Sequence, residues 1–373
     1  MILVVAPTGA PVTGMSLAST VFVDYLRERG NEVEVVELSV LEAPGASALS
    51  RLLHKFRAVI RQILHTARSA SRADVIYFTV SESRLGNAKD LIIMAALGRH
   101  LRRCVLHLHG GAAMRALLHR SKGLTAWVNI AFVRRAATVV VLGRTLRSIY
   151  SGVLPENRIV EVANFALPEL LETEYAITER FKADGPIQVL FLSNLLEGKG
   201  HFELVEAARL LEDSHPGRFV FRFAGAFSDD TTRSRFLQEV QATKNCQYVG
   251  FADLATKQAL LRESHVLALP TYYAYEGQPI CILEAYAAGC VVVTTEHSGI
   301  PDVFADGING FAVAPRDKES LARALARVAS DPVKACAIAV SNRSIAGRAF
   351  TIERYNEQLA VVLDGVAVNA QES

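Results

Sequence analysis

Short apolar runs rich in β-branched residues alternate with helical patterns along most of the chain. In the first half, runs typical of strands occur at Ile2–Pro7, Glu32–Leu38, Val75–Val80, Cys104–His109, Thr138–Leu142 and Arg158–Ala163. In the second half they occur at Gln188–Ser193, Phe219–Gly225, Gln247–Gly250, Val266–Thr271, Cys290–Thr295 and Phe311–Ala314. This alternation predicts parallel sheets that are covered by helices on both faces.

A polar, acidic segment with two prolines, residues 167–186, separates the two halves and is interpreted as a linker. We therefore predict an α/β protein of two doubly wound, Rossmann-like domains, residues 1–166 and 187–348, that face each other across a cleft. Residues 349–373 are expected to form a C-terminal helix that can cross back to the first domain. Ligands of such sheets bind at the carboxyl ends of the strands, so the cleft would suit two substrates.

The net charge of +2 hides an uneven distribution, because residues 51–150 alone carry 18 Lys/Arg and 3 Asp/Glu. This predicts that one face of the first domain meets something anionic. The five cysteines form no CxxC pair and fit buried free thiols in a reducing compartment. No secretory signal and no apolar run of about 20 residues is visible, so we expect a cytoplasmic protein.

Two glutamates, Glu276 and Glu284, flank a loop-to-helix transition at Gly277-Gln278-Pro279. Proline is tolerated in the first turn of a helix, and a helix N-terminus attracts phosphate. Carboxylates beside such a site suit neutral groups rich in hydroxyls, so the pattern indicates a nucleotide-sugar. The alternative is a glutamate at 284 that is buried and satisfied by backbone, with a solvated loop glutamate at 276.

Two glycine-containing loops follow strands. Lys199 lies between Gly198 and Gly200 and can reach a diphosphate, although a solvated turn lysine is the alternative and the Walker A spacing is absent. In the first loop, Thr13 and Gly14 precede a helix without the G-x-G-x-x-G pattern, which argues against NAD. That loop could admit an acceptor or form a plain turn.

His109 ends an apolar strand at the expected cleft edge, with His107 as the alternative functional histidine and a structural role open for both. Ser228-Asp229-Asp230 invites interpretation as a metal site. It fits helix N-cap residues better, because a polar helix follows. No metal is therefore expected.

The stretch Ser50–Arg68 places apolar residues at helical spacing among the basic residues Arg51, Lys55 and Arg61. A second basic and apolar stretch runs from Arg115 to Arg135. One interpretation of the first stretch is an amphipathic helix packed on the sheet. The other is a pair of segments that face an anionic membrane surface. Nucleic acid is disfavoured, because aromatic residues are sparse among the arginines.

The stretch EGQPICILEA, starting at Glu276, resembles the E-x7-E motif of retaining glycosyltransferases of the GT-B fold, in the group called family 4. The likeness extends over FLSNLLEGKGHFELVEAARLL, FRFAGAF, QYVGFADLATKQALLRESHVLALPTYY and AAGCVVVTTEHSGIPDVFADGINGFAV. It is specific over residues 187–330 and looser in the first domain.

The resemblance implies a role for each candidate residue. The second domain would hold the nucleotide-sugar and the first the acceptor. The donor-side roles would fall to Glu284 on the ribose, Glu276 on the sugar, Lys199 and the backbone of Gly277, Gln278, Pro279 and Ile280 on the diphosphate, and Gly250 and Phe251 beside the base. In the first domain, the backbone carbonyl of His109 would lie near the anomeric carbon, and Gly14 would line the acceptor side.

One departure from the family pattern is Asn194, where the family usually has arginine. Without that arginine, the diphosphate would be bound by Lys199, the helix dipole and the neutral donors Ser193 and Asn194. This could mean altered donor preference or a weak enzyme.

The expected protein is a metal-independent, retaining glycosyltransferase without a cofactor. Its donor would be a UDP-sugar by default, with a GDP-sugar next. Its acceptor would be a lipid-linked glycan of envelope or exopolysaccharide synthesis, met on the inner face of the cytoplasmic membrane. The alternatives are a nucleotide-sugar 2-epimerase and a non-catalytic nucleotide-sugar-binding partner subunit.

Overall fold

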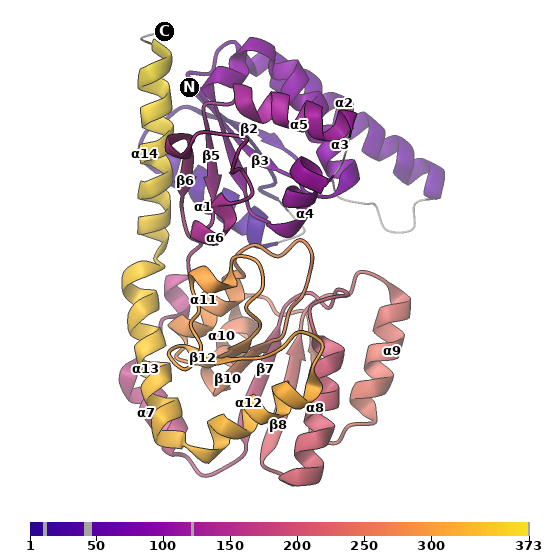
Figure 1. The fold of residues 1–373 in the computed structure, drawn as a ribbon, viewed down its shortest axis with the longest axis vertical. Coiled ribbons are helices and arrows are strands. Elements are labelled where there is room, and N and C mark those ends of the chain that lie inside the picture. Colours follow the sequence, from indigo (N-terminus) through magenta and orange to yellow (C-terminus); the bar gives the residue numbers. More distant parts are fainter. Residues whose placement is uncertain (10–12, 41–46, 121–122, 372–373) are drawn as a thin grey trace. The chain divides into compact units, whose positions relative to one another are not determined.

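The computed structural model describes residues 1–9, 13–40, 47–120 and 123–371. The chain divides into two compact units (Figure 1), which are described separately. Unit 1 contains Met1–Ala163 and Glu353–Ser373, and unit 2 contains Asn164–Ile352.

Unit 1 is built on a six-stranded parallel sheet in the order β2-β1-β3-β4-β5-β6. Its strands are β1 (Ile2–Ala6), β2 (Val33–Glu37), β3 (Val75–Val80), β4 (Cys104–Leu108), β5 (Thr138–Val141) and β6 (Ile159–Glu161). Its α-helices are α1 (Gly14–Glu28), α2 (Ala48–Ala70), α3 (Arg84–Leu97), α4 (Ala112–Arg115), α5 (Leu124–Arg135), α6 (Arg144–Arg147) and α14 (Ile352–Gln371).

The side chains of each central strand alternate between two helix layers, as the period of a strand requires. Ile76 and Phe78 of β3 join the core beneath α3 and α5. Tyr77 instead contacts Phe22 of α1, while His107 of β4 lies beside Tyr355 of α14. Helix α14 therefore packs in unit 1, on the face of the sheet that α1 covers.

Unit 2 repeats this architecture with the strand order β12-β11-β10-β7-β8-β9, again parallel. Its strands are β7 (Ile187–Leu192), β8 (Phe219–Ala224), β9 (Cys246–Gly250), β10 (Val266–Leu269), β11 (Val291–Thr294) and β12 (Gly310–Ala312). Its α-helices are α7 (Glu174–Lys182), α8 (His201–Ser214), α9 (Asp230–Gln241), α10 (Leu254–Glu263), α11 (Ile280–Ala287), α12 (Lys318–Ser330) and α13 (Pro332–Ala349). The predicted class, two doubly wound α/β units, is confirmed.

The interpretation of residues 167–186 as a linker is wrong. This segment contains α7, and Leu170 and Ile177 are buried in the core of unit 2. Arg180 of α7 donates hydrogen bonds to the carbonyl oxygens of Arg262, at 2.7 Å, and Ala288, at 3.0 Å. A few apolar side chains and one arginine thus hold the segment on unit 2. Because apolar residues are sparse in this segment, its sequence resembles that of a linker.

Of the two interpretations of Ser50–Arg68, the one in which its apolar stripe packs on the sheet is wrong for most of the stripe. The face of α2 that is buried consists of small and polar side chains, with Ala58, Gln62 and Thr66 among them. Leu52 and Phe56 are exposed. Among the described residues, no helix is both long and apolar enough to cross a membrane.

Candidate functional site

The loop after β10 and the start of α11 form the centre of the candidate site. Pro279 is the N-cap residue of α11, with φ −63° and ψ 118°, and no side chain caps the helix there. The first backbone N–H groups of α11 therefore lack a side-chain acceptor. This is the geometry in which a helix N-terminus binds an anion.

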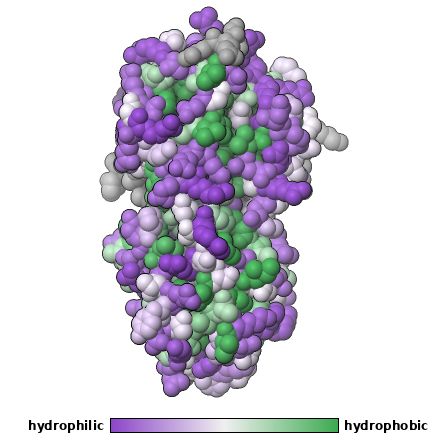
Figure 2. Space-filling model, turned by 90° about the vertical axis from the view of Figure 1, so that its left-hand side faces the viewer, coloured by the Kyte–Doolittle hydropathy of each residue, from purple (hydrophilic) through white to green (hydrophobic). Residues whose placement is uncertain are grey.

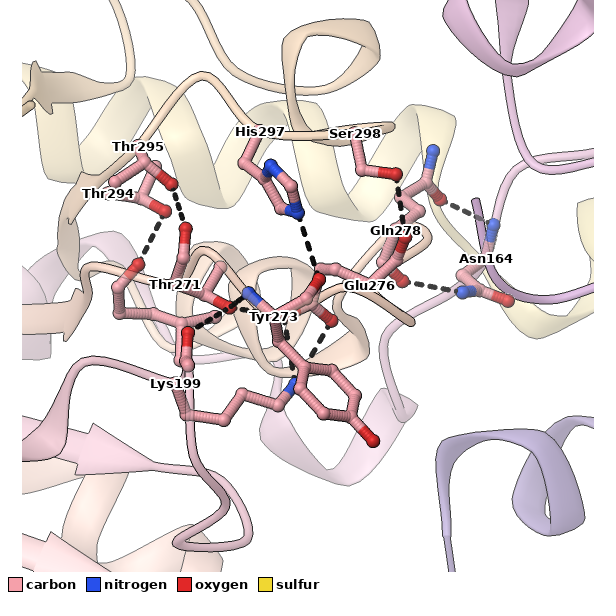
Figure 3. Close-up of polar contacts among 12 residues, drawn as sticks. Asn164, Lys199, Thr271, Tyr273, Glu276, Gln278, Thr294, Thr295, His297 and Ser298 are labelled. Atoms are coloured by element: carbon pink, nitrogen blue, oxygen red, sulfur yellow. Dashed lines mark hydrogen bonds and ion pairs between the residues drawn. The ribbon is translucent and has the colours of Figure 1, made fainter. Parts of the chain in front are cut away.

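Glu276, which precedes this helix start, is buried and ion-paired (Figure 3), so the solvated alternative is excluded. Its carboxylate accepts hydrogen bonds from Lys199 Nζ at 2.8 and 3.1 Å and from Thr271 Oγ1 at 2.8 Å. The residue is only 6% exposed. Both oxygens are thus held in fixed positions beside the N-terminus of α11.

Lys199 is buried too, in the loop between β7 and α8, and so is not a solvated turn lysine. Gly198 and Gly200 have φ of +89° and +82°. A Cβ at Gly200 would collide with the carbonyl oxygen of Pro270, and one at Gly198 would lie 3.1 Å from Cα of Tyr273. The glycines therefore let the lysine loop lie directly against the loop that carries Glu276, because β7 and β10 are neighbours in the sheet.

Glu284, inside α11, is 2% exposed and pairs with Lys257 of α10, whose Nζ lies 2.6 Å from Oε1. Sequence reasoning did not identify Lys257 as the partner of this carboxylate. The single lysine of α10 was the only signal. Cys281 lies in the electrostatic field of both ion pairs, and burial raises the pKa of its thiol to about 12. The helix start is therefore flanked by two lysine–glutamate pairs.

The loop after β11 supports this arrangement from the other side (Figure 3). Ser298 Oγ donates a hydrogen bond to the carbonyl oxygen of Glu276 at 2.6 Å, and the N–H of Gly299 donates to that of Gly277 at 3.0 Å. His297 Nε2 lies 2.9 Å from the carbonyl oxygen of Tyr273. Sequence reasoning did not single out this loop, whose role depends on its backbone geometry, with φ of 55° at Ser298.

Gln278 is fixed by Asn164, the first residue of unit 2. The N–H of Asn164 donates to Gln278 Oε1 at 2.7 Å, and its side-chain amide donates to the Gln278 carbonyl oxygen at 2.8 Å. Through these contacts, Gln278 stabilises the loop before α11.

The remaining predicted donor-side residues lie at the same edge of the sheet in unit 2. Ser193 and Asn194 follow β7, and the Asn194 side-chain oxygen accepts a long hydrogen bond, 3.4 Å, from the N–H of Ala226. Gly250 ends β9 with φ of +92°, and Phe251 after it is exposed. The parallel strands thus bring both pairs, Asn194 and an exposed aromatic ring to one edge.

The interpretation of Ser228-Asp229-Asp230 as helix N-cap residues is confirmed for Asp229. Asp229 is the N-cap residue of α9 and accepts a hydrogen bond from the N–H of Thr232 at 2.7 Å. The described part of the chain contains no group of three His, Cys, Asp or Glu residues placed to hold a metal ion.

In unit 1, His109 follows β4 and stacks on His107, with ring centroids 4.0 Å apart. Burial lowers the pKa of His109 to about 4, so its ring is neutral near pH 7. Its Nε2 has no hydrogen-bond partner among the described residues. His107 is fully buried, with its Nδ1 2.6 Å from the Tyr77 hydroxyl, so it cannot be the accessible histidine.

Glu82, which sequence reasoning missed, fixes the loop after His109. Its carboxylate accepts a hydrogen bond from the N–H of Met114 at 2.8 Å. A Cβ at Gly110 would overlap that carboxylate, so only glycine fits there. Burial raises the pKa of Glu82 to about 7. An acid at the end of a buried strand was the available signal.

Thr13 and Gly14 begin α1. Thr13 is the N-cap residue and forms a capping box with Ser16. The preceding residues 10–12 lie outside the described part of the chain. Nearby, a pocket of about 410 Å³ lies between α2 and the ends of β1 and β2, lined by Gly9, Glu37, His54, Arg61 and Gln62 among others. Arg51 and Lys55 are on exposed turns of α2.

The architecture is that of GT-B glycosyltransferases of known structure. The crystal structure of HepE from Anabaena in complex with UDP and glucose superposes with a TM-score of 0.72 at 18% identity, covering 98% of this chain and 99% of that one. A likeness at this identity defines the fold alone.

Sequence comparison adds similarities that are concentrated in unit 2. Residues 174–343 match the family model of glycosyl transferases group 1. The amylovoran biosynthesis glycosyltransferase AmsK of Erwinia amylovora is 26% identical over 186 residues, covering 49% of this chain and 46% of the relative. The putative colanic acid biosynthesis glycosyltransferase WcaL of Salmonella typhimurium is 28% identical over 193 residues, covering 50% and 47%. The matched stretch spans about half the length of these curated relatives.

Proposed function

We propose that this protein is a retaining, metal-independent glycosyltransferase that moves a sugar from a nucleoside-diphosphate-sugar to a hydroxyl of a lipid-linked glycan. The observation that carries this proposal is the uncapped start of α11 between the pairs Lys199–Glu276 and Lys257–Glu284. The named exopolysaccharide and colanic acid relatives support an acceptor of that kind. The 2-epimerase alternative is not favoured.

The proposed chemistry follows from the charges. A diphosphate at the start of α11 would meet backbone N–H groups and Lys199, which lies 4.8 Å from the centre of the Tyr273 ring. Preformed donors of this kind stabilise charge that develops on a leaving group. Since these groups can carry that charge, the proposal assigns no step to a metal ion.

Glu276 is assigned to the donor sugar as a positioning residue rather than a nucleophile. Its oxygens are already engaged by Lys199 and Thr271. Retention would then come from attack of the acceptor hydroxyl on the face that the diphosphate leaves, through an oxocarbenium-like state. Glu284 would accept hydrogen bonds from the ribose hydroxyls, and Phe251 would border the base.

The donor is proposed to carry uridine, as in the HepE complex with UDP and glucose. The acceptor is assigned to unit 1, with the pocket lined by Gly9 and Arg61 as its candidate site. The proposed place of action is the inner face of the cytoplasmic membrane. His109 is assigned to the sugar side, where a neutral imidazole adds no charge that would oppose an oxocarbenium-like centre.

The test is release of UDP from a panel of UDP-sugars, with GDP-sugars alongside, in the presence of lipid extracts from polysaccharide-producing bacteria and of EDTA. Lys199→Met should lower the rate by about 100-fold or more. Lys182→Met, which removes an exposed lysine of the same unit, should leave it unchanged. The anomeric configuration of the product is read by NMR.

Three outcomes would contradict the proposal. Equal rates for Lys199→Met and Lys182→Met would refute the site, and an inverted product would refute retention. Binding of nucleotide-sugar without turnover on any lipid acceptor would favour the non-catalytic partner subunit.

A further inference from the structure

Helix α2 turns its apolar side to solvent. Its large apolar residues are between 40% and 67% exposed, and they are Leu49, Leu52, Leu53, Phe56, Ile60 and Leu64. The side that is buried against unit 1 carries Ala58, Gln62, Thr66, Ser69 and Ala70 instead. This reverses the usual orientation of an amphipathic helix on a sheet. An exposed apolar surface of this kind marks an interaction site.

The first turns of α2 are largely exposed to solvent in the part that the structure describes. Every described side chain from Leu49 to Arg57 is exposed, and the start of α2 extends beyond the neighbouring helices of unit 1 (Figure 1). Ser47 caps the helix, accepting a hydrogen bond from the N–H of Ser50 at 3.2 Å. A helical segment as short as these first turns is marginal in water when nothing packs against it. A surface that covers the segment would stabilise it.

The charge of α2 identifies the chemistry of that surface. From Ala48 to Ala70 the helix carries Arg51, Lys55, Arg57, Arg61 and Arg68 and no acidic residue. Three of these arginines, at 57, 61 and 68, line a depression of about 380 Å³ together with Ile60, Leu64 and His65. A basic depression beside apolar side chains fits a phosphate attached to an acyl chain.

The other helices of the same layer add to this surface. Leu85 and Ile92 of α3 and Leu124 and Trp127 of α5 are exposed. An exposed tryptophan suits a membrane interface, where one end of the ring is apolar and the other wet. On the α14 side, hydrophilic residues cover much of the surface (Figure 2), and Val361 and Val368 are its exposed large apolar residues.

We propose that α2 docks unit 1 on an anionic lipid bilayer, with Leu52 and Phe56 in the interface and Arg57, Arg61 and Arg68 on headgroup phosphates. A second copy of the chain is the weaker occupant, because two copies of α2 would bring cations together without an acidic residue to pair them. The inference deepens the proposed function, since it names the surface on which a lipid-linked acceptor would be met. Membrane binding itself requires no turnover.

The test is sedimentation of the full chain with vesicles of phosphatidylcholine, alone or mixed with phosphatidylglycerol. We expect binding to the mixed vesicles that weakens with salt. Phe56→Glu and the pair Arg57→Glu with Arg68→Glu should each reduce it, the pair by about 30-fold or more. The matched control is Val361→Glu, which places a charge at an exposed valine on the opposite face of the sheet. It should bind as the unmodified protein does.

Phe56 is exposed, so its substitution should leave the melting temperature unchanged, and this measurement separates docking from folding. Absence of binding to the mixed vesicles, or equal binding of Phe56→Glu and Val361→Glu, would overturn the inference. So would a dimer of the unmodified chain that Phe56→Glu dissociates. Failure of the proposed function would give a different result from failure of the docking inference. UDP-sugars would then give no thermal shift and no turnover, while vesicle binding would persist.

Discussion

Lys257 of α10 and Glu284 of α11 form an ion pair with an N–O distance of 2.6 Å, in which the carboxylate is almost completely buried. The lysine keeps about a fifth of its surface, 21%, in contact with solvent. Glu284 thus lies in the interior of unit 2, and Lys257 reaches it from a position that is partly open to solvent. A buried charge that loses its partner is costly, whereas loss of both partners costs less.

This relationship predicts a non-additive pair of substitutions. Lys257→Met should lower the free energy of unfolding by about 3 kcal/mol, because it leaves the Glu284 carboxylate buried and unpaired. Adding Glu284→Gln should recover a large part of that loss, while nucleotide affinity stays low because the ribose contact is gone. Urea unfolding and calorimetric titration with UDP measure the two effects. Additive stability losses would show that the two side chains are not coupled.

Asn194→Arg is predicted to strengthen binding of a nucleoside diphosphate. Asn194 lies at the end of β7 and makes one long hydrogen bond, 3.4 Å, to the backbone, so little is lost by replacing it. A second cation near Lys199 should lower the dissociation constant of UDP by about tenfold and make it more sensitive to salt. Asn194→Gln is the neutral control. Equal affinities for both variants would place position 194 away from the phosphates.

Gly200→Ala is predicted to destabilise unit 2 more than Gly217→Ala. Both glycines have positive φ, +82° and +69°, so either alanine adds about 1 kcal/mol of backbone strain. Only at position 200 would the new Cβ also collide with the backbone of Pro270, while at 217 nothing lies within 4 Å. The collision should cost about 2 kcal/mol more and displace Lys199. Equal melting temperatures of the two variants would mean that the loop around Gly200 shifts to accept the new Cβ at little cost.

The sequence predicted every strand of both sheets to within a few residues, because buried parallel strands are continuous apolar runs. It also placed Glu276 and Lys199 at the site, since each sits beside glycine or proline at the end of a strand. It could not identify Lys257, because the pairing of α10 with α11 depends on tertiary packing. It left two orientations of α2 open, because periodicity locates an apolar face without showing whether that face points to the sheet or to solvent.

Glu82 gives a prediction that depends on pH. Burial raises its pKa from 4.5 to about 7 in the folded protein, so the folded state binds the proton more tightly than the unfolded chain does. Its contribution to stability is therefore greatest below pH 4.5 and is lost as pH rises towards 7, by about 3 kcal/mol in total. Glu82→Gln keeps an oxygen for the N–H of Met114 but does not titrate.

The difference in free energy of unfolding between the unmodified chain and Glu82→Gln should accordingly fall across that pH interval and stay level above it. Chemical unfolding at a series of pH values measures this difference, which removes the contributions of other groups such as Asp90, whose pKa burial raises to about 6. A difference that does not change with pH would mean that Glu82 titrates normally. Its carboxylate would then be solvated, and the loop of His109 and Gly110 would be held by other contacts.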